Sequence, residues 1–366
     1  MAKRIELDAP NVSEIEKEYL CKSIDSGFVS TFGPQVPEFE NRFAKYIGTG
    51  KAVSIQSGTA AIHIALFESG IGKGDEVIVP SLTFVATINP ILYAGANPVI
   101  VDVDPETWNI DPDEIQRAVT KKTKAIIPVH LYGNPCHMDA LGQIAKEHGL
   151  SMIEDATESL GATYRKKQTG TFGDFGCFSF NGNKLITTGG GGMVAGKNDE
   201  SLDHIKFLVN QARNESEDDY HPEVGFNYRM TNIEAALGLA QLEKIDMFLS
   251  KKRKFNQIYR EELKDINFIR FQEEYMNAES SCWMSCVIFK KKIDISGLQK
   301  KLKENGIPTR RVFIPVVEFP PYKRYKFADH KNSCHIYENS LCLPSSTLNS
   351  EDDIYYVCRT LKRNIL

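Results

Sequence analysis

The sequence predicts an α/β fold: a large, mainly parallel sheet followed by a smaller α+β region. Short β-branched runs alternate with segments of helical periodicity from residue 51 to residue 154. The strand-like runs show little polar alternation, which is typical of parallel sheets covered on both faces. The connections between them are short and contain Gly and Pro, as in successive βα units. Ligands of such sheets bind beyond the carboxyl ends of the strands.

Two helices are expected before the first strand. Ser13 and Glu16 have the spacing of a capping box, and Gly27 supplies a stop for this first helix. A second helix is expected over residues 37–48. The alternation then predicts strands at 51–56, 76–84, 98–103, 124–131 and 150–154, and helices at 59–68, 86–93, 112–119 and 138–148.

The pattern changes after residue 173. Residues 176–180 and 192–195 are expected to be neighbouring short strands around a glycine-rich loop. One long helix is expected over 231–263, where apolar residues recur at helical spacing. A strand at 286–289 and helices at 296–305 and 350–361 would complete the chain. We therefore expect a large domain over residues 1–245, and a linking helix with a small C-terminal domain over residues 246–366.

Composition narrows the class of protein. The 366 residues include 44 basic and 48 acidic side chains, a net charge of −4, which argues against nucleic acid as the main ligand. No apolar run approaches the roughly 18 to 20 residues of a membrane-spanning helix. The first six residues lack the apolar core of a secretory signal. We expect a cytoplasmic protein with no membrane contact.

Metal ligation is not favoured by the cysteines and histidines. Cys282 and Cys286 are separated by three residues and have no partner pair, so buried reduced thiols in a strand are the better interpretation. A metal-dependent hydrolase is the alternative that His130, Cys136 and His137 raise. These three residues lack a second ligand cluster, and we expect no metal.

Three features fit a phosphate-bearing aromatic cofactor. Ser57, Gly58 and Thr59 come directly after a strand and open a helix, where free N–H groups favour a phosphate. These residue types also cap helices, so this feature alone leaves both interpretations open. Asp155 ends a hydrophobic strand. Its carboxylate could keep a pyridine nitrogen protonated or could simply cap a helix.

Lys184 is the third feature. It lies in a loop of small, uncharged residues, 29 positions after Asp155 and five after Ser179. Burial would lower the pKa of its amine and make the amine available as a nucleophile. Together the three features predict pyridoxal 5′-phosphate (PLP): Lys184 bonds to the cofactor, Asp155 faces the ring nitrogen, and Ser179, Gly58 and Thr59 bind the phosphate. The run 189–192 fits neither the dinucleotide nor the P-loop motif.

Seven segments in this order resemble a known family. They are GFVSTFGP (27–34), SGTAA (57–61), PSLTF (80–84), EDA (154–156), GTFGD (170–174), KLITTG (184–189) and GFNYRM (225–230). Over nearly its whole length the chain resembles the DegT/DnrJ/EryC1/StrS family of PLP-dependent nucleotide-sugar aminotransferases. The resemblance implies the aspartate aminotransferase fold (fold type I). It also implies that L-glutamate donates an amino group to a nucleotide-linked keto sugar and leaves as 2-oxoglutarate.

The resemblance also implies roles for single residues. It makes Lys184 and Asp155 catalytic, and it places Phe84 as a ring stacked on the cofactor, with Gly58, Thr59 and Ser179 at the phosphate. Glu158 is a departure, because many members carry Gln or His there, near the phenolic oxygen of the cofactor. Asn227 matches a residue that reaches the phosphate of the neighbouring subunit. The resemblance therefore implies a homodimer with shared active sites.

Substrate contacts are implied for the loop residues Phe28, Ser30 and Thr31, and for Asn183 and Arg229. Arg229 could equally pair with a carboxylate across the subunit interface. The form of residues 181–184 and the glycine run at 189–192 most resemble members that act at C4 of a UDP-linked 4-keto-6-deoxy-N-acetylhexosamine. GDP-linked 4-keto-6-deoxymannose comes next, and a 3-keto sugar remains open. A non-catalytic regulatory protein of the same fold is the alternative from a different class.

Overall fold

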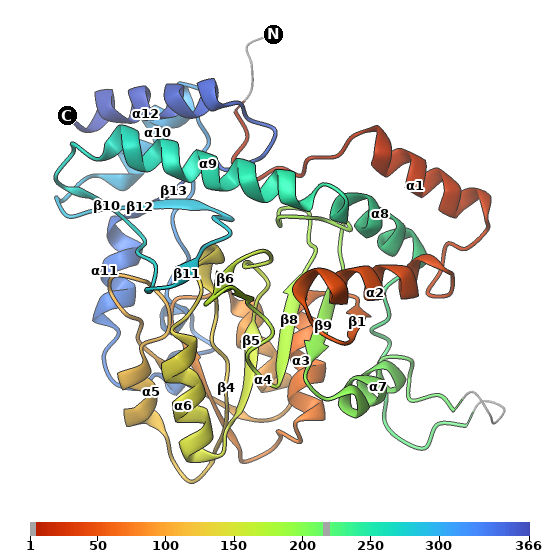
Figure 1. Cartoon of the computed structure of the whole chain (residues 1–366). Coiled ribbons are helices and arrows are strands. Elements are labelled where there is room, and N and C mark those ends of the chain that lie inside the picture. The colour runs from red at the N-terminus through yellow and green to blue at the C-terminus, as the bar shows by residue number, and fades with distance from the viewer. Residues whose placement is uncertain (1–4, 215–219) are drawn as a thin grey trace.

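The computed structural model describes residues 5–214 and 220–366, and its central feature is a seven-stranded sheet (Figure 1). Its spatial order is β1–β9–β8–β5–β4–β2–β3. Only β9 runs antiparallel to its neighbours, β1 and β8. The predicted mainly parallel sheet is confirmed, as is the pairing of two short strands around the glycine-rich loop. Its strands are β1 (Ala52–Ile55), β2 (Glu76–Pro80), β3 (Asn97–Val101), β4 (Thr123–Ile126), β5 (Ser151–Asp155), β8 (Phe175–Ser179) and β9 (Gly192–Gly196).

Helices cover both faces of this sheet. Along β2, Val77 and Val79 pack in the cluster that contains α3, while Ile78 packs in the cluster that contains α5 and α6. Both faces of the strand are therefore buried, which explains the lack of polar alternation. The helices that precede or surround the sheet are α1 (Glu14–Asp25), α2 (Gln35–Ile47), α3 (Gly58–Glu68), α4 (Asn89–Tyr93), α5 (Pro112–Ala118), α6 (Met138–His148) and α7 (Asp199–Leu208).

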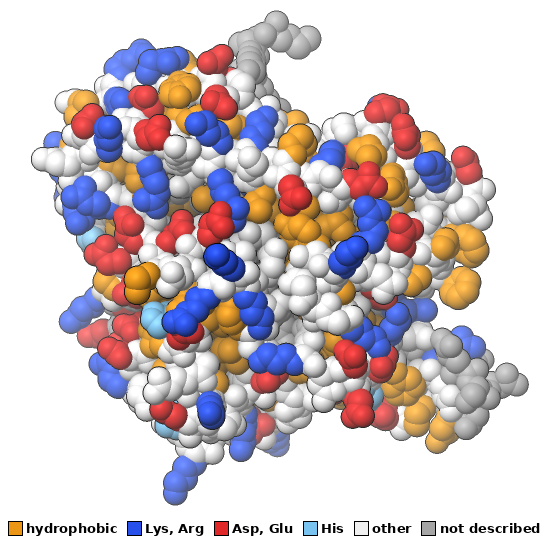
Figure 2. Space-filling view, viewed as in Figure 1, with side chains coloured by type: hydrophobic (Ala, Val, Ile, Leu, Met, Phe, Trp, Pro, Cys, Tyr) orange, Lys and Arg blue, Asp and Glu red, His pale blue; other side chains and the backbone are white. Residues whose placement is uncertain are grey.

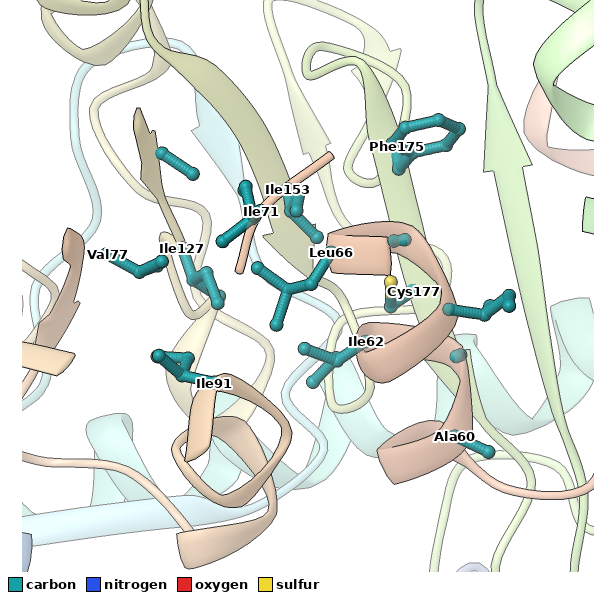
Figure 3. Close-up of a cluster of buried hydrophobic side chains, with 14 of the residues drawn as sticks. Ala60, Ile62, Leu66, Ile71, Val77, Ile91, Ile127, Ile153, Phe175 and Cys177 are labelled. Atoms are coloured by element: carbon teal, nitrogen blue, oxygen red, sulfur yellow. The ribbon is translucent and has the colours of Figure 1, made fainter. Parts of the chain in front are cut away.

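The largest core cluster joins α3 to the middle of the sheet. Figure 3 shows Ile62 and Leu66 of α3 facing Ile153 of β5 and Cys177 of β8. Most of α3 is buried, so its amino-terminal end is fixed against the strand ends. That placement matters for the site described below.

The C-terminal part forms a second, antiparallel sheet of β10 (Ile269–Phe271), β12 (Ser285–Phe289) and β13 (Ser340–Leu343). Its core also contains Ile5 from the start of the described chain. A third small sheet joins β11 (Ala278–Glu279), β6 (Thr163–Tyr164) and β7 (Lys167–Gln168). The remaining helices are α8 (Asn232–Leu242), α9 (Ile245–Leu263), α10 (Ile295–Glu304), α11 (Lys331–Asn339) and α12 (Glu351–Ile365), with 3₁₀ turns at Val85–Thr87, Leu131–Gly133, Val316–Glu318 and Lys323–Tyr325.

The prediction of one helix over 231–263 is wrong, because α8 ends at Leu242 and α9 begins at Ile245, with Glu243 and Lys244 between them. The backbone N–H of Lys244 bonds to Gln241 O at 3.1 Å, a tightened last turn that ends α8. Leu242 and Ile245 nevertheless belong to one core cluster, so the apolar periodicity continues across the break.

The long helix α9 contributes to two cores. Phe248 packs with the helices α2 and α8, whereas Phe255 packs in the cluster of the C-terminal sheet. The division at residue 245 remains a prediction.

In Figure 2, acidic and basic side chains are interspersed over one face. Among the helices of the described residues, none is both long and apolar enough to cross a membrane.

Candidate active site

A cavity of about 340 Å³ opens beyond the ends of β1, β5 and β8. This is the position that the sheet topology predicts for a ligand. Eight of the predicted site residues line it together: Gly58, Thr59, Phe84, Asp155, Glu158, Ser179, Asn183 and Lys184.

One end of the cavity is the amino terminus of α3. The Ser57 side chain accepts a hydrogen bond from Ala60 N at 3.1 Å, and the first helical backbone bond is made by Ala61 N. The N–H groups of Gly58 and Thr59 come before it, as a phosphate site requires. A Cβ on Gly58 would lie 2.9 Å from the Ser179 Cβ. Only glycine therefore allows this close approach to Ser179.

Asp155 is held at the end of β5 with its side chain buried. Its Oδ2 accepts a hydrogen bond from the Thr87 hydroxyl at 2.7 Å, and its Oδ1 accepts one from Thr157 N at 3.2 Å. Thr87 lies in the 3₁₀ turn after Phe84. The carboxylate is thus fixed at the cavity wall, where it can face a protonated ring nitrogen.

Lys184 follows β8 and lies opposite two further groups. Its Nζ is 3.6 Å from Glu158 Oε1 and 4.4 Å from the centroid of the Trp283 ring. Burial raises the pKa of Glu158, and this effect is opposed by Lys184 and by the hydrogen bond that Tyr132 N donates to Glu158 Oε2. An amine beside a carboxyl group and an aromatic face can act both as a nucleophile and as a proton carrier.

The aromatic side of the cavity is formed by two phenylalanines. The Phe84 side chain is 55% exposed, and its ring centroid lies 5.8 Å from that of Phe313. Such an exposed ring at a cavity mouth is available to stack on a planar ligand. Together with the α3 terminus, Asp155 and Lys184, it gives the cavity a donor set that fits PLP: phosphate donors, a partner for the pyridine nitrogen and an amine.

Among the lining residues that the sequence did not predict, three carry large aromatic or charged side chains: Trp283, Arg310 and Phe313. They come from the C-terminal region, more than a hundred positions after the family segments around Asp155. No local motif marks them, because only the packing of the C-terminal sheet beside the large one brings them to the cavity. Arg310 therefore lies in the same cavity as Lys184 only because of tertiary packing.

Five predicted residues do not line this cavity: Phe28, Ser30, Thr31, Asn227 and Arg229. The loop at 28–31 is anchored elsewhere, since Phe28 O and Ser30 O accept hydrogen bonds from Asn232. Asn227 is exposed to solvent, and the backbone of Arg229 pairs with Ile55. These five residues could contact a ligand of this cavity in two ways only. The ligand would have to extend beyond the cavity, or the residues would have to reach the cavity of a neighbouring subunit.

The hydrolase alternative finds no support in the histidines. His130 bonds to Glu154 through Nε2 at 2.9 Å and accepts Cys136 N at Nδ1, and His137 caps α6 by accepting Ala140 N. Within residues 5–214 and 220–366, no group of three or more His, Cys, Asp or Glu side chains could hold a metal ion. Cys282 and Cys286 are both free and buried, as expected, but only Cys286 lies in a strand, β12. The Sγ of Cys286 lies 3.4 Å from the Sγ of Cys342.

Comparisons with known proteins agree with this geometry. Residues 10–362 match the model of the DegT/DnrJ/EryC1/StrS aminotransferase family. The GDP-perosamine synthase of Caulobacter vibrioides is 40% identical over 363 residues, covering 98% of this chain and 97% of that protein. The enzyme of the same name from Escherichia coli O157:H7 is 39% identical over 360 residues, covering 98% of each.

A solved structure extends the likeness to three dimensions. The PLP-form of Spr1654 from Streptococcus pneumoniae superimposes with a TM-score of 0.94 at 28% identity, covering 99% of this chain and 98% of that chain. The predicted fold type I architecture is thereby confirmed. The chain therefore belongs to the DegT/DnrJ/EryC1/StrS aminotransferase family and is a sugar aminotransferase whose cofactor is pyridoxal 5′-phosphate.

Proposed function

We propose that this enzyme transfers the amino group of L-glutamate to C4 of GDP-linked 4-keto-6-deoxymannose. The support for the acceptor is the near full-length similarity to relatives that are named GDP-perosamine synthase. This choice reverses the order drawn from residues 181–184, which favoured a UDP-linked 4-keto-6-deoxy-N-acetylhexosamine. The UDP-linked sugar is kept as the second acceptor to be tested, and the family resemblance supports L-glutamate as donor.

The observation that carries the aminotransfer is the convergence of Lys184, Asp155 and the α3 terminus on one cavity. When bound, PLP supplies the electron sink for the reaction. Asp155 would hold the ring nitrogen in its protonated form, and Gly58, Thr59 and Ser179 would bind the phosphate. Lys184 Nζ would take the proton from Cα of the donor and, in the second half reaction, deliver a proton to the sugar carbon. The donor leaves as 2-oxoglutarate.

We also propose that the enzyme is a homodimer with shared active sites. The last turn of α1 exposes Ile24, and the α1–α2 connection exposes Phe28, Val29 and Phe32. Figure 2 shows hydrophobic side chains at this edge of the molecule. An apolar loop of this kind is typical of a protein–protein contact. Asn227 is exposed as well, which leaves it able to reach a neighbouring subunit.

An absorbance spectrum of the purified enzyme tests the activity. The wild-type protein should show a band near roughly 410 nm that L-glutamate bleaches, since glutamate converts the bound cofactor to its amine form. GDP-4-keto-6-deoxymannose should then restore the band, and the UDP-linked sugar should not. Lys184→Ala should lack both responses. Restoration by the UDP-linked sugar alone would overturn the proposed acceptor, and a wild-type band that glutamate leaves unchanged would overturn the donor.

A further inference from the structure

Two thiols face each other in the C-terminal sheet, close to the active-site cavity. Cys286 of β12 and Cys342 of β13 are directly opposite each other. Both are free and buried, and the Cys286 Sγ donates to the Cys342 Sγ at 3.4 Å. The amino transfer described above uses neither side chain. The fold therefore holds a pair of nucleophilic groups that still lacks a role.

The backbone of Cys342 shows that the two residues are cross-strand neighbours of the closer kind. Cys342 N donates to Arg310 O at 2.8 Å, and Arg310 N donates to Cys342 O at 3.4 Å. Because both backbone groups of Cys342 face Arg310, Cys286 and Cys342 form a non-hydrogen-bonded pair. The Cα atoms of such a pair are about 4.5 Å apart, and disulfides span Cα separations of about 4.4 to 6.8 Å. The two sulfurs can therefore bond with little movement of the strands.

Arg310 makes this pair more reactive than the other buried thiols. Burial opposes ionisation of Cys342, but the Cys286 S–H and the Arg310 guanidinium lower the pKa of Cys342 below its ordinary value. Burial raises the pKa of Cys286, so Cys342 is the sulfur that ionises more readily. A thiolate is the nucleophile in cysteine oxidation, and a nearby cation favours it. Burial raises the pKa of the remaining buried thiols, which are Cys136, Cys177, Cys282 and Cys358.

A small cavity leads to Cys286 from the surface. Its volume is about 20 Å³, which is enough for a molecule about the size of water. Glu274, which is exposed, and Arg260, which is partly exposed, line this cavity together with Cys286. A small neutral oxidant such as hydrogen peroxide can use this route, whereas a peptide or protein thiol is too large for it.

We propose that Cys286 and Cys342 are a redox-sensitive pair that hydrogen peroxide converts into a disulfide. The ionised sulfur of the pair attacks one oxygen of the peroxide, the O–O bond breaks, and the leaving hydroxide takes up a proton to become water. The second sulfur then gives up its proton and attacks the resulting sulfenic acid, from which the hydroxyl group leaves as water. Two electrons pass from the thiols to the peroxide. The products are one S–S bond and two water molecules.

Arg310 couples this pair to the active site. Its guanidinium lines the active-site cavity, with its carbon 5.3 Å from the centroid of the Trp283 ring. Lys184 Nζ lies 4.4 Å from the same centroid. In the dithiol form the Cys342 sulfur attracts the guanidinium, whereas a disulfide cannot ionise. We expect oxidation to slow the amino transfer, because Arg310 is then held less firmly beside Lys184.

Mass spectrometry of the holoenzyme tests the modification itself. Enzyme treated with hydrogen peroxide would be unfolded, its free thiols blocked, and the chain digested with trypsin. A peptide pair joined through Cys286 and Cys342 should appear and should be lost on reduction with dithiothreitol. Cys282→Ala removes the other thiol of the small cavity and is the matched control, which should form the same link. Oxidised enzyme without this link, or with Cys286 joined to Cys282, would overturn the proposal.

The coupling to the active site is tested by the rate at which L-glutamate bleaches the cofactor band. After removal of the peroxide, this rate should be lower by about fivefold or more, the lower end of typical coupling between two sites. Dithiothreitol should restore it, which would exclude oxidised methionine as the cause. In Cys342→Ala the rate should be low from the start and should change less than about twofold on oxidation.

The wild type alone also decides the coupling, because its loss of rate should follow the fraction of linked peptide. A link that forms without a change in rate would overturn the coupling through Arg310. The rate measurement rests on the proposed donor, L-glutamate. A reduced wild-type enzyme that glutamate does not bleach would contradict that donor, whereas the mass measurement would still decide the disulfide.

Discussion

The Asp155 carboxylate is held by the Thr87 hydroxyl and by Thr157 N. The effect of its charge on the rate can therefore be measured separately from the effect of its positioning. Asp155→Asn removes the charge but keeps the size of the side chain, so kcat should fall by about 10²- to 10³-fold, as for other groups that stabilise charge in the reaction. Thr87→Val removes only the hydrogen bond at 2.7 Å and should cost less than tenfold. Steady-state rates would be measured with the cofactor band recorded for each variant. Activity of Asp155→Asn within threefold of the wild type would contradict the assignment.

Lys252 illustrates how burial of a single residue makes stability depend on pH. Its Nζ donates to Trp283 O at 2.9 Å and Ser345 O at 2.8 Å, and burial lowers its pKa from 10.5 to about 8. Between these two pH values the unfolded chain binds a proton that the folded chain does not, so folding becomes more favourable as pH rises.

The measurement compares the wild type with Lys252→Met. The free energy of unfolding of the wild type, relative to that of the variant, should rise by up to about 3 kcal/mol between pH 8 and pH 10.5. Denaturant titrations at several pH values would give this difference. A difference that stays constant with pH would show that Lys252 is not charged differently in the two states.

At the scale of elements, Glu16 connects α1 to the break between α8 and α9. It completes the capping box with Ser13, pairs with Lys244 and accepts from Gln241 at 2.5 Å. Burial opposes its ionisation, but these partners lower its pKa from 4.5 to about 2. The carboxylate therefore stabilises the fold above pH 4.5, and this contribution is lost as pH falls toward 2.

Glu16→Gln should lower the free energy of unfolding at pH 7 by about 1.5 to 3 kcal/mol, the range for hydrogen bonds to charged groups. The difference from the wild type should shrink as pH falls from 4.5 to 2. Glu14→Gln is the matched control, because the Glu14–Lys17 pair is exposed and screened by solvent, so its loss should change the free energy of unfolding less than the loss of the Glu16 carboxylate does. Equal effects of the two substitutions would refute the anchoring role.

The helices and strands that the sequence predicts are those with a signal in neighbouring residues, such as a capping motif or a β-branched run. The capping box at Ser13 and the β-branched run of β2 are encoded in neighbouring residues. The capping box is found as expected, and the strand expected over 76–84 is found as β2, which ends at Pro80. The break after Leu242 was missed because the core accepts apolar residues on both sides of it. Two-residue strands such as Thr163–Tyr164 carry no period that could reveal them.

At the scale of the whole molecule, one side of the cavity is built from residues that the sequence pattern predicts, and the other side is built from residues that it does not predict. Asp155 and Ser179 stand at the ends of predictable strands, and Lys184 lies in the loop that follows β8. Their meeting therefore follows from the topology of a mainly parallel sheet. Trp283 and Arg310 reach the cavity only because a second sheet packs beside the first, which no periodicity in the sequence specifies. The cofactor side was therefore predictable, and the wall around Arg310 was not.

The proposed homodimer gives the last prediction, because shared sites allow two inactive variants to complement each other. If Asn227 reaches the partner's cofactor phosphate, a heterodimer of Lys184→Ala and Asn227→Ala subunits contains one intact site. Random mixing makes about half of the dimers mixed, so activity should recover to about a quarter of the wild-type value.

The matched control mixes Lys184→Ala with Asp155→Asn. Both residues line the cavity of the same chain, so every site of a mixed dimer carries one defect, and no recovery is expected beyond the residual activity of Asp155→Asn. Sedimentation velocity would first establish that each variant dimerises, and subunits would be exchanged by unfolding and refolding together. No recovery with Asn227→Ala would show that each active site is built by a single chain. Recovery in the control mixture would show that Lys184 and Asp155 of one site come from different chains, against the cavity described here.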